Sequence, residues 1–435
     1  MPEEKPVHFA ARTAWERRPN ALSLAWERRL ASGAPADDLT ESNPTRCGFR
    51  YPAERILRAL ADPRALRYEP HPRGLPLARE RLAAHLDGQA DAPPDGARGG
   101  RRDQRRDQRA DQTQDEPQDE PPGGRAPSCH PDRLVLTAST SEAYAWLFKL
   151  LCERGDRVLI PRPSYPLFDF LAGLEEVELA PYPLRFDGRW RLDLAALAAA
   201  VDERTRAVVV VHPNNPTGNA LLATEAAALG ELCARRGLAV ISDEVFLEYL
   251  EEGAARPERL AGSLAAESPA LTFSLGGLSK SAGLPQIKAG WIRAGGPDGL
   301  VEEALGRLEV IADTYLSVNT PAQWALPELL AAGREVAAQI LARVRGNRRW
   351  LETRSGGTAW QVLPADGGWS AVLRLPRIRS EEEWCLLLAA EEGVLLHPGF
   401  FFDFPSEAYL VASLLPEERT FRGAMERACR RIEAD

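Results

Sequence analysis

The sequence lacks any apolar run long enough to cross a membrane, although 44% of its 435 residues are hydrophobic. It also lacks an excess of basic residues, because its formal net charge is −9. Binding to nucleic-acid phosphates needs a basic face, so nucleic acid is not expected as the main partner. The apolar content suffices for a large buried core, which indicates a globular protein of two or three domains.

Cysteine is scarce, and its spacing disfavours two kinds of site. The six cysteines lie far apart and form no C-x-x-C pair. Neither a zinc site nor a disulfide framework is implied, and no metal is expected. Residues 1–6 lack the basic-then-apolar pattern of a secretory signal. We therefore expect a protein of the reducing cytoplasm, without a membrane partner.

The segment 88–127 contains almost no apolar residue and repeats Arg-Arg-Asp-Gln at 101–104 and 105–108. A segment with so little surface to bury cannot offset the entropy lost when its backbone becomes ordered. We predict that it is a disordered insertion at a surface loop, since long structureless loops are uncommon inside compact domains.

Short apolar runs alternate with helical stretches between about residues 132 and 310. The run 207–211 is apolar throughout, as expected for a strand that is covered on both faces. This alternation predicts an α/β fold with a mostly parallel, seven-stranded sheet flanked by helices, which binds ligands at the carboxyl ends of its strands. The expected strands are 133–137, 157–160, 177–179, 207–211, 238–241, 270–274 and 287–292.

The remaining pattern predicts a second, smaller α+β domain. Helices are expected at 12–33 and 258–266, and a helical region at 298–354 should break near Pro321. Short strands and helices follow it. We divide the chain into an N-terminal arm with part of the small domain (1–62), a large domain (63–310) and a small C-terminal domain (311–435).

Polar residues follow two of the expected strands. Ser139, Thr140 and Ser141 open a helix, where hydroxyl groups cap the helix and where the same N–H groups can bind a phosphate. Tyr165 stands between two prolines, so it either packs on the core or offers a flat surface for an aromatic ring. Both interpretations stay open for each of these motifs.

Three further residues indicate the chemistry of a ligand. Asn215 lies in a turn after the run 207–211, and its amide can donate to a ligand oxygen. Asp243 ends another buried strand, where a carboxylate suits a cationic ring nitrogen. Lys280 lies among small residues, either solvated or confined so that its amine attacks an aldehyde. Together with a phosphate site and a stacking aromatic, these residues describe pyridoxal 5′-phosphate.

The chain resembles the class I and II aminotransferases, a group of fold-type I pyridoxal-phosphate enzymes. The resemblance is carried by Asn215-Pro-Thr-Gly218, Ser242-Asp-Glu-Val-Phe246 and Leu278-Ser-Lys280-Ser-Ala-Gly-Leu-Pro285, in the family's order and spacing. It covers nearly the whole chain outside 88–127. It implies that the large domain binds the cofactor, that an amino group passes from an amino acid or amine to a keto acid, and that a homodimer shares its active sites.

The resemblance also implies a role for each matching residue. Lys280 would form the internal aldimine and shuttle the proton between Cα and C4′. Asp243 would keep the pyridinium nitrogen protonated, Asn215 would bond the ring oxygen O3′, and Tyr165 would stack on the ring. Asn43 would lie where the N-terminal segment closes over the substrate. The phosphate would be bound by Ser139, Thr140, Ser141, Ser279 and, from the neighbouring subunit, Tyr68.

Three residues depart from the family's pattern. Lys288 stands where an arginine usually binds the phosphate, so a cation is kept but its bidentate fork is lost. Phe246 replaces a tyrosine and removes one hydrogen bond to the ring oxygen. Val411 stands where an arginine usually binds the substrate's α-carboxylate. Either another cation, such as Arg46, takes over this role or the substrate lacks an α-carboxylate, and we favour an unusual amino donor.

The segment 397–402, His-Pro-Gly-Phe-Phe-Phe, either forms an aromatic wall near the substrate or packs within the small domain. The sequence also leaves two other activities open. Decarboxylases and C–S or β-lyases use the same cofactor and the same site residues. A non-catalytic relative that serves as a sensor or scaffold is the third possibility, motivated by the three departures.

Overall fold

The computed structural model describes residues 7–88, 129–251 and 258–435. The predicted insertion at 88–127 therefore lies outside the described residues, apart from Gly88. Within the described part of the chain, none of the helices is both long and apolar enough to cross a membrane.

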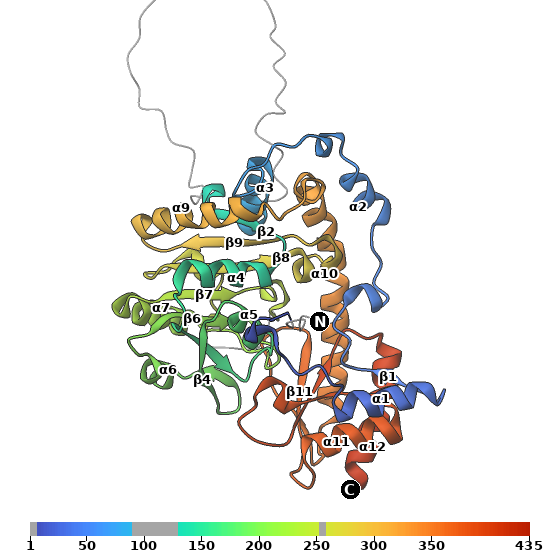
Figure 1. The fold of residues 1–435 in the computed structure, drawn as a ribbon. Coiled ribbons are helices and arrows are strands. Elements are labelled where there is room, and N and C mark those ends of the chain that lie inside the picture. Colours follow the sequence, from blue (N-terminus) through green and yellow to red (C-terminus); the bar gives the residue numbers. More distant parts are fainter. Residues whose placement is uncertain (1–6, 89–128, 252–257) are drawn as a thin grey trace, which may run out of the picture.

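A central sheet of eight strands organises the larger part of the molecule (Figure 1). Its order is β2-β9-β8-β7-β6-β3-β4-β5, and β9 runs antiparallel to both of its neighbours. The seven predicted strands are all present. The eighth strand, β5, forms a hairpin with β4. It was not predicted because its three residues are too few to give a periodic pattern. The strands are β2 (Leu134–Thr137), β3 (Arg157–Arg162), β4 (Glu178–Phe186), β5 (Trp190–Leu192), β6 (Thr205–Val211), β7 (Ala239–Asp243), β8 (Thr272–Gly277) and β9 (Gly290–Gly295).

Helices cover both faces of this sheet. On β6, Val209 packs in one apolar cluster and Val208 and Val210 pack in another, because side chains alternate along a strand. The run 207–211 is therefore apolar throughout because both faces of β6 are covered, as the sequence predicted. One face is covered by α4 (Thr140–Leu151), α5 (Phe168–Leu174) and α9 (Asp298–Tyr315), and the other by α3 (Pro76–Leu86), α6 (Leu194–Ala200) and α7 (Ala223–Arg236).

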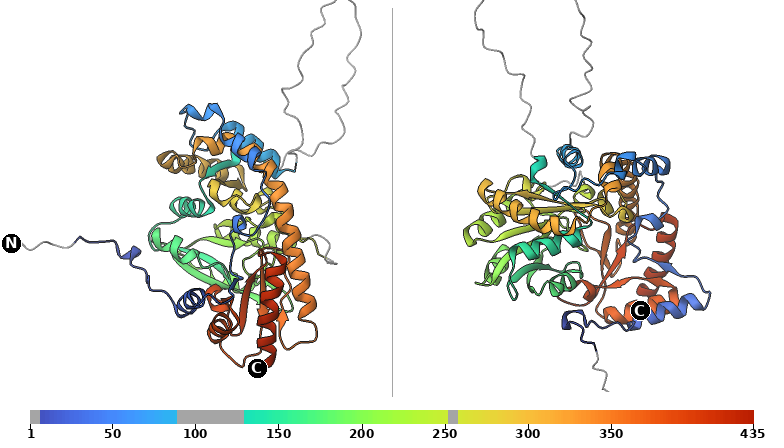
Figure 2. Two further views of the ribbon diagram at one scale, coloured as in Figure 1. Left: turned by 90° about the vertical axis from the view of Figure 1, so that its right-hand side faces the viewer. Right: turned by 45° about the horizontal axis from the view of Figure 1, so that its top comes forward.

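The 35-residue helix α10 (Thr320–Arg354) connects the two parts of the fold. Leu326 and Leu329 pack with β2 and β9 of the central sheet, whereas Ile340 and Val344 pack in the cluster of the smaller part. Figures 1 and 2 show this helix running past the edge of the sheet to the smaller part. The predicted break before it is present, since the Asn319 side chain caps α10 by accepting the N–H of Ala322.

The smaller part combines segments from both ends of the chain. Leu22 and Leu39 share one apolar cluster with Leu410 and Phe421, and Figure 1 shows the first long helix, Ala21–Ala31, beside the helices near the C-terminus. The sheet order is β10-β11-β14-β13. The strands are β10 (Gln361–Val362), β11 (Ser370–Arg374), β13 (His397–Pro398) and β14 (Tyr409–Ser413), with a second pair β1 (Asp37–Asp38) and β12 (Val394–Leu395). The helices are α1 (Ala21–Ala31), α11 (Glu381–Leu387) and α12 (Glu418–Ala434), while α2 (Ala53–Leu60) packs on α10. The division at residues 62 and 310 stays a prediction.

Two predicted helices differ from the structure. The helix expected at 12–33 begins only at Ala21, after Pro19, because the Asn20 side chain accepts the N–H of Ser23 and caps it there. The prediction of a helix at 258–266 is wrong, because the structure has only one short helical turn there, at Leu264–Ala266. The backbone of Arg259 and Ala261 instead bonds to residues 221–223. These tertiary bonds override the local helical pattern.

A close approach of α10 to α8 (Leu278–Ser281), the short helix that carries Lys280, depends on Gly333. A Cβ at Gly333 would lie 2.2 Å from the Cβ of Ala282. Gly333→Ala is therefore expected to destabilise the fold by about 1–3 kcal/mol through overpacking. Gly306→Ala in α9 is the matched control, because nothing lies within 4 Å of its added Cβ. Thermal unfolding should show a lower Tm for the first variant only, and equal Tm values would contradict this packing.

Candidate functional site

The carboxyl ends of β6, β7 and β8 bring the main predicted site residues together. Val211, the last residue of β6, pairs with Asp243, and Asp243 pairs with Leu275 of β8. The chain leaves β8 at Gly277, and Lys280 follows three residues later on α8. These parallel strands end at the same edge of the sheet, where an open α/β fold binds its ligands.

Asp243 is a carboxylate that the protein only partly compensates. It accepts a hydrogen bond from the hydroxyl of Tyr144 at 3.1 Å and one from the N–H of Val245 at 3.2 Å. Burial raises the pKa of Asp243 to about 6, and the charge of Lys280 only partly opposes this. A cation placed against this carboxylate would remove the cost of burying its charge.

Lys280 holds its amine in an aromatic surrounding. Its Nζ lies 5.0 Å from the ring centroid of Trp369 and 5.9 Å from that of Phe246. The hydroxyl of Tyr249 donates to the carbonyl oxygen of Lys280 at 2.7 Å and fixes the backbone there. Burial lowers the pKa of Lys280, and Asp243 acts in the opposite direction. A larger fraction of the amine is therefore unprotonated than in a free lysine, which favours nucleophilic attack.

Asn215 lies in a turn that the C-terminal part of the chain holds in place. Its Oδ1 accepts a hydrogen bond from Ser370 Oγ at 3.4 Å. The N–H of Asp366 donates to the carbonyl of Gly218 at 2.7 Å. A Cβ at Gly218, where φ is +67°, would lie 2.5 Å from the carbonyl oxygen of Gly367. The glycine of the Asn-Pro-Thr-Gly motif is thus required by both its backbone angle and this contact.

Tyr165 stands after β3 at the same edge and is 45% exposed. Its pKa is raised first by burial and second by the negative charge of Asp243, so its hydroxyl lies within the field of that carboxylate. The neighbouring Ser164 donates its N–H to the carbonyl of Phe402 at 2.9 Å. The ring of Tyr165 is therefore free to contact a ligand beside Asp243, while its loop is fixed.

The residues predicted to bind phosphate lie along three adjacent strand ends. Gly290, the first residue of β9, pairs with Thr137 at the end of β2 and with Gly277 at the end of β8. A Cβ at Gly290 would lie 3.2 Å from the carbonyl carbon of Ser139. This register places the start of α4 beside α8 and beside the loop before β9. The predicted residues on these segments are Ser139, Thr140, Ser141, Ser279 and Lys288.

This arrangement can bind an anion. Ser139 caps α4 through its Oγ, which accepts the N–H of Glu142 at 3.2 Å, so the positive end of that helix faces the same edge. Lys288 is exposed and takes φ of +58°, a left-handed backbone angle that is uncommon outside glycine.

Comparison with known proteins identifies the family of this chain. Residues 124–420 match the family described as aminotransferase class I and II. The chain belongs to this family. Aminotransferases of this class use pyridoxal 5′-phosphate, and the chain is accordingly a pyridoxal-phosphate-dependent aminotransferase by family. The α/β fold and the family inferred from the three sequence motifs are confirmed.

Curated relatives of this chain include both aminotransferases and a lyase. The chain is similar to an alanine aminotransferase of Mycobacterium tuberculosis, at 29% identity over 309 residues, which cover 68% of this chain and 70% of the relative. It is also similar to the S-alkyl-thiohydroximate lyase SUR1 of Arabidopsis thaliana, at 29% identity over 279 residues, which cover 62% of this chain and 60% of the relative.

Solved structures share the fold across the whole chain. Alanine aminotransferase from Pyrococcus furiosus superimposes with a TM-score of 0.79 and 20% identity, covering 98% of this chain and 100% of that one. A tyrosine aminotransferase from Leishmania infantum gives a TM-score of 0.75 at 19% identity, covering 97% and 99%.

The residues of this aminotransferase fit its cofactor. The buried carboxylate of Asp243 lacks full compensation, which a protonated ring nitrogen would supply. The amine of Lys280 has a lowered pKa and lies within reach of the same edge. Bound there, pyridoxal 5′-phosphate supplies an aldehyde and a ring that takes up electrons.

The residues considered at the substrate end of the site differ in their exposure and in their partners. Arg46 is exposed, with 74% of its side chain accessible, and pairs with Glu41 at 3.7 Å. Asn43 uses its side-chain oxygen to accept the N–H and hydroxyl of Thr45, so it shapes the loop that carries Arg46. Val411 is 2% exposed and packs in an apolar cluster with Val372. Tyr68 lies before α3 and is 77% exposed.

Sequence reasoning missed three residues that contact this site. Tyr144 bonds Asp243 from the middle of α4, and Trp369 and Ser370 reach Lys280 and Asn215 from the start of β11. Tyr144 lies on the predicted helix that opens with the hydroxyl residues, so its side chain could have been considered. Trp369 and Ser370 carry no local signal, because their contacts are with residues about 90 to 155 positions away.

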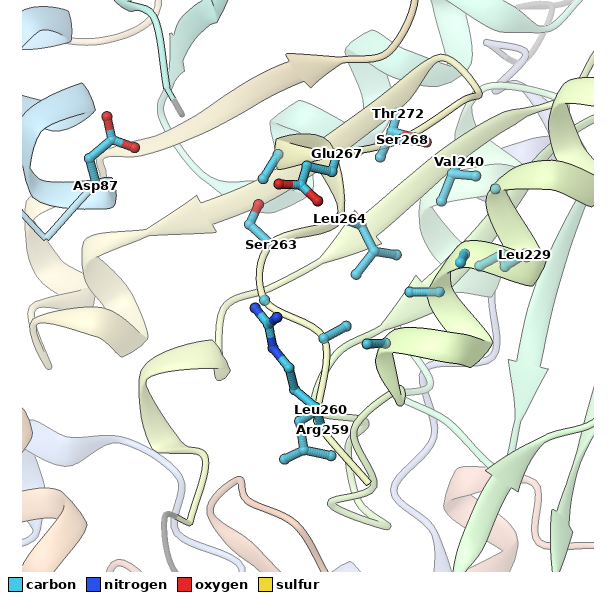
Figure 3. Close-up of a pocket in the computed structure, with 17 residues that line it drawn as sticks. Asp87, Leu229, Val240, Arg259, Leu260, Ser263, Leu264, Glu267, Ser268 and Thr272 are labelled. Carbon is cyan, nitrogen blue, oxygen red and sulfur yellow. The ribbon is translucent and has the colours of Figure 1, made fainter. Parts of the chain in front are cut away.

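A separate cavity of about 420 Å³ lies between α7 and the segment before β8 (Figure 3). Arg259, Ser263 and Glu267 line it, together with Asp87 from the end of α3. Its lining contains none of the residues predicted to bind the cofactor or the substrate. The cavity is therefore distinct from the candidate active site.

Proposed function

We propose that this aminotransferase binds pyridoxal 5′-phosphate covalently through Lys280 and transfers an amino group from an amino acid or amine to a keto acid. The observation that carries the proposal is the pair formed by Lys280 and Asp243. A buried amine of lowered pKa and a buried carboxylate of raised pKa lie at the ends of β8 and β7, where the charge of each acts on the other. Opposed shifts of this kind at one site are typical of acid–base chemistry.

Each further residue contributes an interaction of its own. Asp243 would pair with the ring nitrogen, Asn215 would bond the ring oxygen, and Tyr165 would stack on the ring. Lys280, once released from the cofactor, would carry the proton between the substrate's reacting carbon and the cofactor. Phosphate binding falls to the residues at the three strand ends, namely Ser139, Thr140, Ser141, Ser279 and Lys288.

We also propose a homodimer with shared sites, in which Tyr68 reaches the phosphate bound by the neighbouring subunit. Support comes from exposed apolar side chains, since Leu66 is 90% exposed and Val310 is 70% exposed. Tyr68 lines a surface hollow with Trp146, whose ring stacks on that of Tyr315. Apolar surface of this kind often marks a protein interface. The six cysteines are all free, which is compatible with a cytoplasmic protein.

A lyase is the second candidate function, because one relative bears the name of a lyase. The two reactions differ in the fate of the amino group. In transamination it stays on the cofactor, so an amino donor converts the bound cofactor into pyridoxamine 5′-phosphate, and a keto acid restores it. In a lyase reaction, product forms while the cofactor keeps its aldehyde.

The test is a single-turnover experiment on the reconstituted protein with a panel of amino acids and amines. Absorbance should show loss of the lysine-bound cofactor with at least one donor, and its return when a keto acid is added. Product release without this conversion would favour the lyase. A colourless protein after incubation with the cofactor would contradict both candidates.

A further inference from the structure

One face of the small sheet forms a wall opposite the turn that carries Asn215. Ser370 on β11 reaches Asn215 directly, with Oγ and Oδ1 3.4 Å apart. Val372 lies on the same face as Ser370, because side chains alternate along a strand. Val411 of β14 pairs with Val372, so it shares that face as well. Ser370 is thus the residue of this face that reaches the turn of Asn215, and the two buried valines continue the same face beyond it.

His397 extends this wall. It pairs with Val411 across the antiparallel strands β13 and β14, and residues paired in this way have Cβ atoms roughly 5 Å apart on one face. The imidazole ring lies 5.7 Å from the ring of Phe402 and 5.8 Å from that of Phe401. Since the carbonyl of Phe402 accepts the N–H of Ser164, this aromatic loop adjoins the loop of Tyr165.

The charges around this wall disfavour a carboxylate. Val411 offers no polar atom, and burial lowers the pKa of His397, so its ring is neutral near pH 7. The charged group that acts on the ring is Asp38, which is negative. Three arginines that flank this wall are already paired: Arg46 with Glu41 at 3.7 Å, Arg162 at the end of β3 with Asp403 at 3.3 Å, and Arg348, which donates to the carbonyl of Ser370, with Glu251 at 3.2 Å. A carboxylate placed here would therefore bind less favourably than a neutral polar group, because it would lose water without gaining an unpaired cation.

We infer that His397 determines the substrate specificity of this site, and that the preferred amino donor carries a neutral polar group instead of an α-carboxylate on its reacting carbon. Amino alcohols and amino-acid amides are the chemical class. A neutral imidazole can donate one hydrogen bond and accept another, which suits a hydroxyl or a carboxamide. Val411 and Val372 contact the carbon atoms beside that group. The inference rests on the proposed function, since it concerns the donor of the same site.

The test compares three matched ligands on the cofactor-loaded protein: phenylalanine, phenylalaninol and 2-phenylethylamine. Dissociation constants come from the ligand-induced change in cofactor absorbance, and conversion to pyridoxamine 5′-phosphate is recorded in the same samples. Phenylalaninol should bind roughly tenfold more tightly than phenylalanine. It should also bind more tightly than 2-phenylethylamine, by up to roughly tenfold, because its hydroxyl adds one hydrogen bond. The alanine series, with alaninamide, repeats the comparison for a small side chain.

Two variants separate specificity from structure. His397→Leu should abolish the advantage of phenylalaninol over 2-phenylethylamine, while His397→Gln should retain most of it; a purely structural role would weaken both ligands equally. Val411→Arg should raise the affinity for phenylalanine relative to phenylalaninol by roughly tenfold. Phenylalanine binding as tightly as phenylalaninol in the wild type, an unchanged preference in His397→Leu, or no saturable change with any ligand overturns the inference. If the ligands show the expected preference but the cofactor is not converted to pyridoxamine 5′-phosphate, the specificity inference is supported and only the proposed transamination is contradicted.

Discussion

Replacing Lys280 with alanine is expected to lower the turnover number by about 10⁴-fold or more. The change removes the amine that would hold the cofactor and would move the proton at the reacting carbon. Among the described residues neither of the other two lysines shares its buried position, because Lys288 is exposed on the loop before β9 and Lys149 pairs with Glu175 on the surface. The absorbance band of the lysine-bound cofactor should disappear with the activity.

Lys149→Ala is the matched control for that loss. Its ion pair with Glu175 lies at the surface, and exposed pairs contribute little to stability. Activity and absorbance should therefore stay at the wild-type level. If Lys280→Ala retained both, the amine that holds the cofactor would have to be sought elsewhere.

Replacing Asp243 with asparagine is expected to lower kcat/KM by about 10²- to 10³-fold. Asparagine has the same shape and can still accept the N–H of Val245, so the change mainly removes the negative charge. Without that charge the ring nitrogen of the cofactor would lose its proton, and the ring would take up electrons less readily. Steady-state kinetics with saturating cofactor measure the effect, and a change below threefold would contradict the assigned role.

The same residue gives the cofactor-free protein a pH-dependent stability. Asp243 keeps its proton up to a pKa of about 6 in the folded chain, whereas the usual value is 3.8. The folded state therefore binds more protons between pH 4 and 6, and the free energy of unfolding falls as the pH rises through this range, by up to about 3 kcal/mol. Denaturant titrations should show this fall in the wild type, a smaller fall in Asp243→Asn, and recovery when the cofactor's cation pairs with the carboxylate.

Tyrosine variants test the supporting contact. Tyr144→Phe removes the hydroxyl that donates to Asp243, so the pKa of this carboxyl should rise further and cofactor affinity should weaken by several fold. Tyr182→Phe is the control, because Tyr182 is buried on the same sheet but donates to the carbonyl of Val209 instead. Equal effects of the two variants would indicate general destabilisation.

The sequence predicted the parts of this molecule whose causes are local. An apolar run at 207–211 indicated a strand covered on both faces. Asn215 and Asp243 were predicted from their places at strand ends, and Lys280 was predicted from its small neighbours. The helix expected at 258–266 failed because backbone bonds to residues 221–223 hold that segment. Tertiary contacts of this kind have no local pattern.

The substrate end shows the same limit. The family resemblance predicted that Val411 stands in place of a cation, but the residue beside it depends on the register of β13 against β14. That register pairs Val411 with His397. Likewise, Arg46 was a plausible replacement from sequence, and its pairing with Glu41 on an exposed loop became visible only in three dimensions. Trp369 reaches Lys280 because the small sheet docks beside the ends of the large one.

The most direct test of the central claim is to identify the residue that holds the cofactor. Sodium borohydride fixes pyridoxal 5′-phosphate to the amine that binds it, and the chain has only four lysines, Lys5, Lys149, Lys280 and Lys288. Peptide mass spectrometry of the reduced protein should find the label on the peptide of Lys280 alone. Label on Lys288, or on none of the lysines, would contradict the account.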